Sequence, residues 1–464
     1  MSDLVHNVNP SDTRDVIGSF EPCGAAQAHS AIARAREAFV HWRKSSPQER
    51  ADILDAAGSR ILAVRQALGE QLAREEGKTL AEAVGEVTRA GHIFKFFAGE
   101  ALRVQGHSGG SVRPGVDVDV SVEPIGVFGL ITPWNFPIAI PAWKLAPALA
   151  FGNCAVLKPS EFTPASAASL SRILSESGLP EGVLQVVDGI GSEAGAALVE
   201  SPDVDGISFT GSQATGRGIA ASCGQQLKRV QLEMGGKNPL LVCEDADIAV
   251  AVECAINGAF FSTGQRCTAS SRLIVVDAIH DQFVARMTER IKALRVGHAL
   301  EKGVEIGPVI HQAQLDKNQQ WLQRAVSDGA DLACGGELLK RETPGFYMSP
   351  ALFVNTRNDM PVNTTEVFGP LASVIRVGDF EEGLALANDT AFGLCAGVCT
   401  QSLSRATHFR REAQAGLVMV NLPTAGIDYH VPFGGRRSSS FGPREQGDAA
   451  RDFYTQGKTA YIRD

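Results

Sequence analysis

The sequence lacks an uninterrupted apolar run that could cross a bilayer. Its most apolar stretch, residues 125–142, is broken by Gly126, Gly129, Pro133 and Pro137, so it predicts buried strand and loop rather than a membrane helix. A basic surplus is also missing, because the formal net charge is −9 at pH 7. These two absences argue against a membrane or a nucleic acid as the main partner.

A disulfide framework and an export signal are missing as well. The nine cysteines are an odd number scattered along the chain, and the first residues contain no basic segment followed by an apolar one. We therefore expect reduced thiols and a cytoplasmic location. Cys395 and Cys399 have no accompanying His or Asp, so no metal site is expected.

Length and periodicity instead predict an α/β protein of more than one domain. The 464 residues exceed what one compact core accommodates. Residues 24–103 show helical spacing, with a second helix beginning at Pro47. Residues 116–122 alternate in polarity as a strand does, and residues 458–462 predict a terminal strand. Between 127 and 275, apolar strand-like runs alternate with helical ones, which is typical of a doubly wound parallel sheet.

Two glycine-rich segments carry residues suited to covalent chemistry. Cys267 directly follows Arg266, whose guanidinium is expected to lower the thiol pKa, whereas the other cysteines lie in apolar runs. Glu233 precedes Gly235 and Gly236, which allow close approach of the backbone to a ligand. A thiolate that attacks a carbonyl, followed by a carboxylate that activates water, fits this pair. The alternatives are a buried free cysteine and a surface glutamate.

A rigid polar loop interrupts the apolar stretch around Asn135. Pro133 and Pro137 fix the backbone on both sides of it, so the side-chain amide is held where it can donate to a developing oxyanion. The alternative is an ordinary turn asparagine. The other loop residues are Thr132, Trp134 and Phe136.

Two glycine patterns follow predicted strands and begin predicted helices, where backbone N–H groups can bind phosphate. One contains Gly191 and Gly195, at a spacing close to but different from the dinucleotide fingerprint. The other contains Gly211 and Ser212. A cation and a carboxylate that suit ribose hydroxyls follow a third strand, in the run Lys158-Pro159-Ser160-Glu161.

Together these runs resemble the NAD(P)-dependent aldehyde dehydrogenase superfamily, and the similarity covers nearly the whole chain. The motifs stand in the family's order: TPWNFP at 132–137, KPSE at 158–161, FTGS at 209–212, LEMGGKNP at 232–239, GQRC at 264–267, EVFGP at 366–370 and PFGG at 432–435. Any one of them is modest support. Seven in order leave little room for coincidence.

The resemblance implies a fold and a domain division. We expect the aldehyde dehydrogenase fold, with a Rossmann-like cofactor domain, an α/β catalytic domain and a small β oligomerisation arm. The implied boundaries are 1–105 and 125–235 for the NAD(P)-binding domain, 236–436 for the catalytic domain, and 106–124 and 437–464 for the arm. A homodimer or a homotetramer follows as an expectation.

The resemblance also implies catalytic roles and a reaction. Cys267 would be the nucleophile, and Asn135 with the backbone N–H of Cys267 would form the oxyanion hole. Glu233 would activate the deacylating water, and Lys144 would lie near the proton path. The aldehyde would pass through a thiohemiacetal and a thioester to a carboxylic acid. CoA-acylating relatives typically lack the glutamate, so its presence favours hydrolysis.

The implied cofactor is NAD, with NADP possible. Lys158 and Glu161 would hold the adenosine ribose, and a carboxylate at 161 accepts from a free 2′-OH but repels a 2′-phosphate. Glu366 would hold the nicotinamide ribose, and Phe368 would pack near the nicotinamide. The other residues expected at the cofactor are Thr132, Pro133, Trp134, Ser160, Gly191, Gly195, Phe209, Gly211, Ser212 and Gly235.

The implied substrate is a small aldehyde. Residues 421–435 and 439–447 look like the branch that oxidises 2-oxoglutarate semialdehyde, an aldehyde that already carries a carboxylate. Arg266 could bind that carboxylate bidentately. The alternative is that Arg266 pairs with a protein acid or only tunes Cys267. The expected substrate contacts are Phe136, Trp143, Arg266 and Phe433.

Other hypotheses remain open at this point. Phe136, Trp143, Ile140 and Phe261 could form an apolar tunnel for an aromatic or aliphatic aldehyde of the benzaldehyde or vanillin kind. Succinic semialdehyde is a further candidate substrate. A CoA-acylating enzyme and a non-catalytic protein with the same fold complete the set. Arg437 also departs from the residue expected in the 2-oxoglutarate semialdehyde branch.

Overall fold

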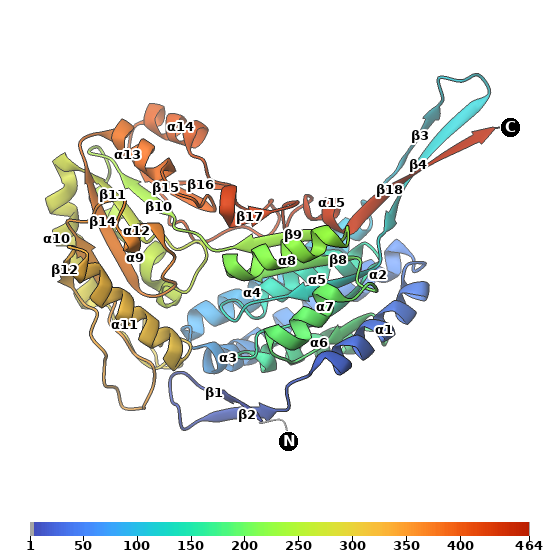
Figure 1. Ribbon diagram of the computed structural model, residues 1–464, viewed down its shortest axis with the longest axis horizontal. Coiled ribbons are helices and arrows are strands. Elements are labelled where there is room, and N and C mark those ends of the chain that lie inside the picture. The colour runs from blue at the N-terminus through green and yellow to red at the C-terminus, as the bar shows by residue number, and fades with distance from the viewer. Residues whose placement is uncertain (1–3, 464) are drawn as a thin grey trace.

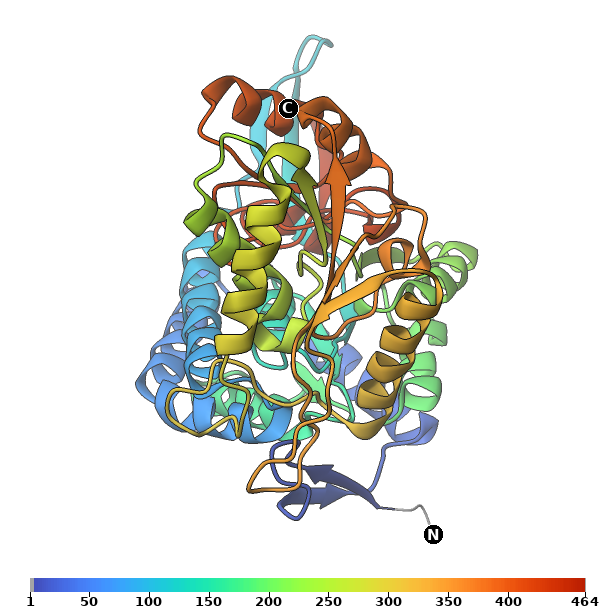
Figure 2. The same ribbon diagram turned by 90° about the vertical axis from the view of Figure 1, so that its left-hand side faces the viewer.

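The computed structural model describes residues 4–463 and shows two α/β units with a narrow β arm projecting from one of them (Figures 1 and 2). Near the start of the chain, β1 (Val5–Val8) pairs with β2 (Val16–Phe20). Four helices follow: α1 (Ala25–Trp42), α2 (Pro47–Ala63), α3 (Arg65–Glu76) and α4 (Leu80–Ala101). They occupy the predicted helical region, and α2 begins at Pro47 as expected.

The first unit is built on a six-stranded sheet in the order β17-β9-β8-β5-β6-β7. Its parallel strands are β5 (Val127–Ile131), β6 (Cys154–Lys158), β7 (Leu184–Val186), β8 (Gly206–Gly211) and β9 (Arg229–Met234). The antiparallel edge strand is β17 (Ser440–Phe441). The connecting helices are α5 (Ala139–Ala150), α6 (Pro164–Glu176), a π turn at Gly191–Gly195 that continues into α7 (Ala196–Glu200), and α8 (Gln213–Gln225).

The second unit is built on a seven-stranded sheet in the order β12-β13-β14-β11-β10-β15-β16. Its strands are β10 (Pro239–Val242), β11 (Arg272–Val276), β12 (Asp331–Cys334), β13 (Ala351–Val354), β14 (Leu371–Val377), β15 (Cys395–Cys399) and β16 (Leu417–Val420). Its helices are α9 (Ile248–Phe260), α10 (Asp277–Ala293), α11 (Gln312–Ser327), α12 (Pro361–Thr364), α13 (Phe380–Asn388) and α14 (Leu403–Glu412). All pairings are parallel except that of β12 with β13.

The arm is a three-stranded antiparallel sheet in the order β18-β4-β3. It consists of β3 (His107–Gly110), β4 (Val116–Pro124) and β18 (Thr455–Arg463), and α15 (Ala450–Tyr454) leads into β18. The arm extends away from the body of the molecule (Figure 1). Tyr461 and Ile462 are exposed on it, so it presents apolar surface that has no cover within this chain.

Several expectations can be compared with this fold. The alternating run at 116–122 forms β4, and all nine cysteines are free. Within residues 4–463, no cluster of His, Cys, Asp and Glu is arranged to hold a metal ion. No helix in the described part of the chain is long and apolar enough to span a membrane. The domain boundaries stay a prediction.

Candidate active site

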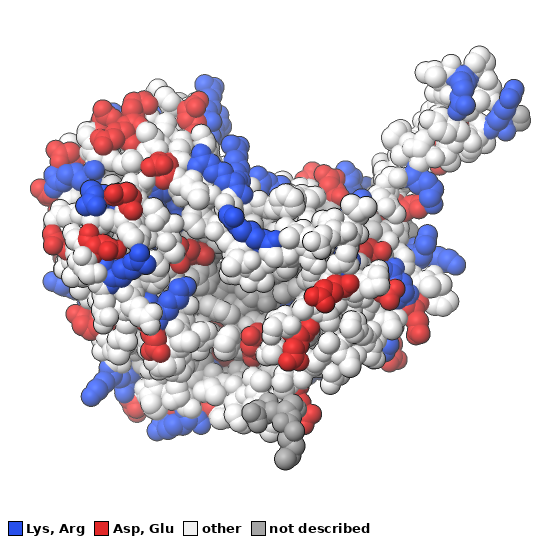
Figure 3. Space-filling model, in the orientation of Figure 1, with Lys and Arg blue, Asp and Glu red and all other residues white. Residues whose placement is uncertain are grey.

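A cavity of about 760 Å³ lies between the two units. The six-stranded unit contributes residues from α4, α5, β8 and β9, and the other unit contributes residues from α9, α11 and the segment around Phe368. The face drawn in Figure 3 is hollowed between the units, and its acidic and basic side chains are intermixed. Cys267, Asn135 and Glu233 all lie on the cavity wall.

Cys267 is held by the end of α9 and the segment that follows it. Ser262 and Thr263 take left-handed backbone angles, with φ of 51° and 58°, and the side-chain amide of Asn238 donates to the Cys267 carbonyl at 2.8 Å. Burial, with smaller contributions from the carboxylates of Glu366 and Glu233, raises the pKa of the Cys267 thiol to about 12. The expected lowering by Arg266 is therefore wrong, because burial and the nearby carboxylates outweigh any effect of the guanidinium.

This raised pKa predicts slow, pH-dependent alkylation of the cofactor-free protein. Because only the thiolate reacts, the rate of Cys267 modification by iodoacetamide should rise about tenfold per pH unit between pH 7 and 9. Mass spectrometry of the labelled peptide measures it, with Cys267→Ala giving the background from the other thiols. A rate that levels off below pH 8 would show that the thiol pKa is lowered after all.

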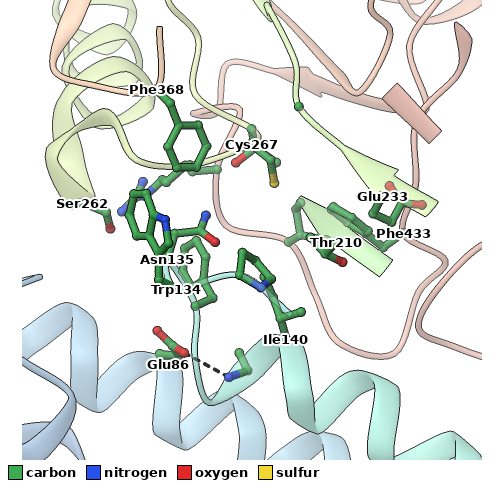
Figure 4. Close-up of a pocket in the computed structure, with 18 of the residues that line it drawn as sticks. Glu86, Trp134, Asn135, Ile140, Thr210, Glu233, Ser262, Cys267, Phe368 and Phe433 are labelled. Atoms are coloured by element: carbon green, nitrogen blue, oxygen red, sulfur yellow. Dashed lines mark hydrogen bonds between the residues drawn. The ribbon is translucent and has the colours of Figure 1, made fainter. Parts of the chain in front are cut away.

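Asn135 faces Cys267 across the cavity (Figure 4). Its side-chain amide donates to the Gln265 carbonyl at 3.0 Å. Its own backbone carbonyl accepts from Lys78 Nζ at 2.6 Å. One bond thus holds the side-chain amide and the other holds the backbone of the same residue, which suits a donor that must be in place before charge develops on a substrate oxygen.

Arg266 lies on the cavity wall, and two of its three guanidinium nitrogens have protein partners, while its Nε–H is buried without an acceptor among residues 4–463. Arg266 Nη2 donates to Glu82 Oε1 at 2.9 Å, and Nη1 donates to Asn257 Oδ1 at 3.3 Å. The same Glu82 oxygen accepts from the backbone N–H of Ser262 at 2.8 Å. This pairing favours the alternative in which Arg266 binds a protein acid and supports the segment before Cys267.

A buried ion cluster lies beneath the Asn135 loop. Lys78 Nζ is 2.6 Å from Glu86 Oε2 and 3.8 Å from Glu76 Oε2. Glu86 Oε1 accepts from the backbone N–H groups of Ile138 and Ala139 at 2.9 and 3.0 Å, and Figure 4 shows Glu86 below the loop. The cluster thus ties α3 and α4 to the middle and the end of the loop.

Replacing Lys78 by methionine should destabilise the protein strongly. The change leaves two buried carboxylates without their cation, and removing one partner of a buried pair costs about 3–5 kcal/mol. Lys95→Met in α4 is the matched control, because its pair with Asp55 is half-exposed and is worth about 0–1 kcal/mol. Urea denaturation measures the free energy of unfolding of both variants. Equally small decreases in the two variants would contradict a stabilising role for the cluster.

Glu233 is the penultimate residue of β9 and is buried. Its Oε2 accepts from Ser440 Oγ at 2.5 Å, across the pairing of β9 with β17. Burial, followed by the neighbouring Glu445 carboxylate, raises the pKa of Glu233 well above its usual range. Figure 4 shows Glu233 apart from Cys267 on the cavity wall, so a water between them would connect the two.

Lys144 lies behind the cavity wall rather than on it. It is fully buried, donates to Ser208 Oγ at 2.7 Å and forms an ion pair with Glu445. Glu445 was missed by the sequence reasoning, although the run that contains it was noted. The available signal was a glutamate two residues before Gly447, and its contact with Lys144 spans 301 residues, which no local pattern reveals.

The expected cofactor residues fall into two groups. Pro133, Trp134, Gly211, Ser212, Gly235, Glu366 and Phe368 line the cavity. The others lie off its wall, in or near the carboxyl ends of the parallel strands β5, β6, β7 and β8, where α/β folds bind dinucleotides: Thr132, Lys158, Ser160, Glu161, Gly191, Gly195 and Phe209.

The cavity-lining group has a defined geometry. Phe368 has a left-handed φ of 63° and contacts Trp134 edge to face, with ring centroids 5.4 Å apart. Glu366 Oε1 accepts from the Gly236 N–H at 2.9 Å, and a Cβ on Gly235 would lie 1.9 Å from Glu366 Oε2. Only glycine therefore leaves Glu366 in this position.

The expected substrate contacts are apolar except for Arg266. Phe136, Trp143 and Phe433 line the cavity, and the rings of Trp143 and Phe433 lie 5.5 Å apart. Ile140 and Leu422 extend this surface. The wall beside Cys267 can therefore accommodate the carbon chain of an aldehyde.

The fold and the site define a thiol-dependent oxidoreductase of the α/β class. A model of the aldehyde dehydrogenase family matches residues 2–460, and the chain belongs to this family. It is therefore an NAD(P)-dependent enzyme that oxidises aldehydes to carboxylic acids.

Curated relatives match over nearly the full length. The chain is 43% identical to an alpha-ketoglutarate semialdehyde dehydrogenase of Haloferax volcanii, covering 98% of this chain and 94% of the relative. It is 40% identical to an alpha-ketoglutaric semialdehyde dehydrogenase of Bacillus subtilis, with 99% and 95% covered. It is 38% identical to a 2,5-dioxopentanoate dehydrogenase of Saccharolobus solfataricus, with 98% and 95% covered.

Solved structures agree on the fold. A betaine aldehyde dehydrogenase of Staphylococcus aureus in complex with NAD⁺ matches with a TM-score of 0.97 and 32% identity, covering 99% of this chain and 92% of that one. An NADP-dependent enzyme of E. coli matches with a TM-score of 0.95 and 35% identity, with 100% and 95% covered.

Proposed function

We propose that this enzyme oxidises 2-oxoglutarate semialdehyde (2,5-dioxopentanoate) to the dicarboxylic acid with NAD, and with NADP as a possible second cofactor. The observation that carries the proposal is the full-length similarity to three relatives named for this aldehyde, at 38–43% identity. The cavity supports it, because its apolar wall runs beside a thiol and a carboxylate suited to hydrolytic oxidation.

The residues present fit a dinucleotide. Ser212 caps the N-terminus of α8 on the cavity wall, where backbone N–H groups favour phosphate. Glu366 is positioned for a ribose, and Glu161 lies 3.2 Å from Lys158 Nζ, so a carboxylate that repels a 2′-phosphate stands beside a cation that attracts one. Bound NAD(P) supplies a hydride acceptor at its nicotinamide ring.

The chain's own residues would then perform the reaction as follows. The Cys267 sulfur, as thiolate, attacks the aldehyde carbon, and the Asn135 amide and the Cys267 N–H stabilise the oxygen that becomes negative. Departure of hydride leaves a thioester on Cys267. Glu233 takes a proton from water, the water oxygen attacks the thioester carbon, and the sulfur leaves with its electron pair.

The assembly and the location of the enzyme are part of the proposal. The exposed apolar residues of the arm, such as Tyr461, support a homodimer or homotetramer formed through it. The nine free cysteines support a cytoplasmic location. The division into cofactor domain, catalytic domain and arm is proposed with the boundaries given above.

A substrate panel tests the proposed function. NADH formation is followed without CoA for 2-oxoglutarate semialdehyde, succinic semialdehyde, benzaldehyde and hexanal. We expect 2-oxoglutarate semialdehyde to have the highest kcat/KM, with both carboxylated aldehydes ahead of the others by at least about tenfold, equivalent to about 1.4 kcal/mol. A preference for benzaldehyde or hexanal would replace the proposal with an apolar-aldehyde dehydrogenase, which the ring pair of Trp143 and Phe433 would accommodate.

A further inference from the structure

The face of α4 that lines the cavity carries four residues at helical spacing: Glu82, Gly85, Glu86 and Arg89. Positions i, i+3, i+4 and i+7 lie on one side of a helix. Arg89 was not singled out from the sequence. It is the charged member of this face that forms no ion pair within 4.0 Å among residues 4–463, although the carboxylates of Glu86 and Asp428 act on it at longer range.

The charges on this face can be followed pair by pair. Glu82 is 2.9 Å from Arg266, and Glu86 is 2.6 Å from Lys78. Arg89 forms no ion pair within 4.0 Å among residues 4–463, and its one hydrogen bond there is from Nη2 to the amide oxygen of Gln446 at 3.0 Å. Its Nε–H is buried without an acceptor in the same part of the chain.

Such an arrangement is costly unless an anion compensates it. A buried donor without an acceptor costs about 1–3 kcal/mol, and a guanidinium in an apolar setting costs more. Burial lowers the pKa of Arg89 to about 10, so the side chain is still a cation at neutral pH. The cavity therefore contains a charge that an incoming carboxylate would satisfy.

Arg89 is also placed along the path of a short substrate. Its guanidinium carbon lies 5.5 Å from the Trp143 ring centroid, and Trp143 lies 5.5 Å from Phe433. Phe433 in turn belongs to the cluster against which Cys267 packs. Trp143 and Phe433 thus form a continuous apolar wall between the guanidinium and the thiol.

We propose that Arg89, held by Gln446 and stacked on Trp143, binds the carboxylate of the substrate while the aldehyde carbon reaches Cys267. This inference rests on the proposed function and names the residue that would produce its specificity. Arg266 is less suited, because its Nη1 and Nη2 already donate to Asn257 and Glu82. Lys317, another cation on the cavity wall, is exposed and lies on the side of Glu366.

The test compares 2-oxoglutarate semialdehyde with pentanal, which has the same chain length but no carboxylate. In Arg89→Met, kcat/KM for the carboxylated aldehyde should fall about 100-fold, chiefly through a higher KM, because a charge-assisted contact is lost. Pentanal should change less than about threefold. Arg89→Lys should recover part of the preference, since it keeps the charge without the fork.

Arg266→Met is the matched comparison. Because Arg266 supports the segment before Cys267, this variant should lower kcat/KM for both aldehydes by similar factors and keep their ratio. If Arg266→Met abolishes the preference in kcat/KM for the carboxylated aldehyde over pentanal while Arg89→Met keeps it, the proposal is overturned in favour of Arg266. Equal losses for both aldehydes in Arg89→Met would also overturn it, by showing a structural role only.

The wild-type ratio separates this inference from the proposed function. A wild-type enzyme without preference for the carboxylated aldehyde refutes the proposed function, and the Arg89 assignment with it. A wild-type preference that survives in Arg89→Met refutes the Arg89 assignment alone. Protection of Cys267 from iodoacetamide by 2-oxoglutarate gives a readout that needs no turnover: we expect it in the wild type, and its persistence in Arg89→Met would overturn the assignment.

Discussion

Replacing Cys267 by alanine is expected to lower aldehyde oxidation by about 10⁴-fold or more, to the background of the assay. Without the sulfur, neither the thiohemiacetal nor the thioester can form, and the other cavity residues offer no nucleophile in the same place. The fold should persist, because Cys267 is only partly buried and its backbone contacts to Asn238 do not involve the side chain. NADH formation and thermal unfolding measure the two effects.

Cys23→Ala is the matched control for this experiment. Cys23 is also partly buried and free, but it packs against the core of the first unit and lines no part of the cavity. It should keep near-normal activity. Substantial oxidation by the Cys267→Ala protein would refute the covalent mechanism and leave a non-enzymatic or differently catalysed role to be tested.

Glu233→Gln is expected to separate the two halves of the reaction. Thioester formation should continue, so mixing with aldehyde and NAD should give about one equivalent of NADH per active site, followed by turnover reduced by about 10²–10⁴-fold. Rapid-mixing absorbance measures the burst, and mass spectrometry of the quenched protein should find the acyl group on Cys267.

The pH dependence of the wild type follows from the same carboxyl group. Because the pKa of Glu233 is raised well above its usual range, the group is protonated at low pH and becomes a base only as pH rises through that value. Where deacylation limits turnover, kcat should therefore fall as the pH is lowered. In Glu233→Gln this decrease of kcat at low pH should be absent. Glu176→Gln, at an exposed position on α6, is the control.

Two outcomes would contradict this role for Glu233. Normal steady-state turnover of Glu233→Gln would show that another group activates the water. Turnover of the wild type only after CoA is added would show that a thiol, rather than water, takes the acyl group. The short contact to Ser440 Oγ should hold glutamine in nearly the same place, so a loss of activity is not explained by displacement of the side chain.

Residues that carry local signals could be predicted from the sequence. Cys267 stands in a glycine-containing run unlike those of the other cysteines, Asn135 is fixed by prolines, and Glu233 precedes two glycines; all three line one cavity. The parallel strands were visible as apolar runs that alternate with helical ones. In each case, neighbouring residues determine the local conformation, so the pattern contains the information.

The supporting contacts could not be predicted, because they join distant segments. Glu82 is paired with a residue 184 positions away, and Lys78 bonds to a carbonyl 57 positions away. The pKa of Cys267 was mispredicted for the same reason. A neighbouring arginine is visible in the sequence, whereas burial and the approach of Glu366 are properties of the folded cavity.

The pairing of β17 with β9 has a consequence for biosynthesis. Ser440 and Glu445, which contact Glu233 and Lys144, leave the ribosome after every strand of both large sheets except β17 itself. A nascent chain can therefore assemble most of its fold while the Glu233 carboxylate still lacks its contact with Ser440. Catalytic competence should appear late in synthesis, so premature termination shortly before residue 440 would yield a largely structured but inactive protein.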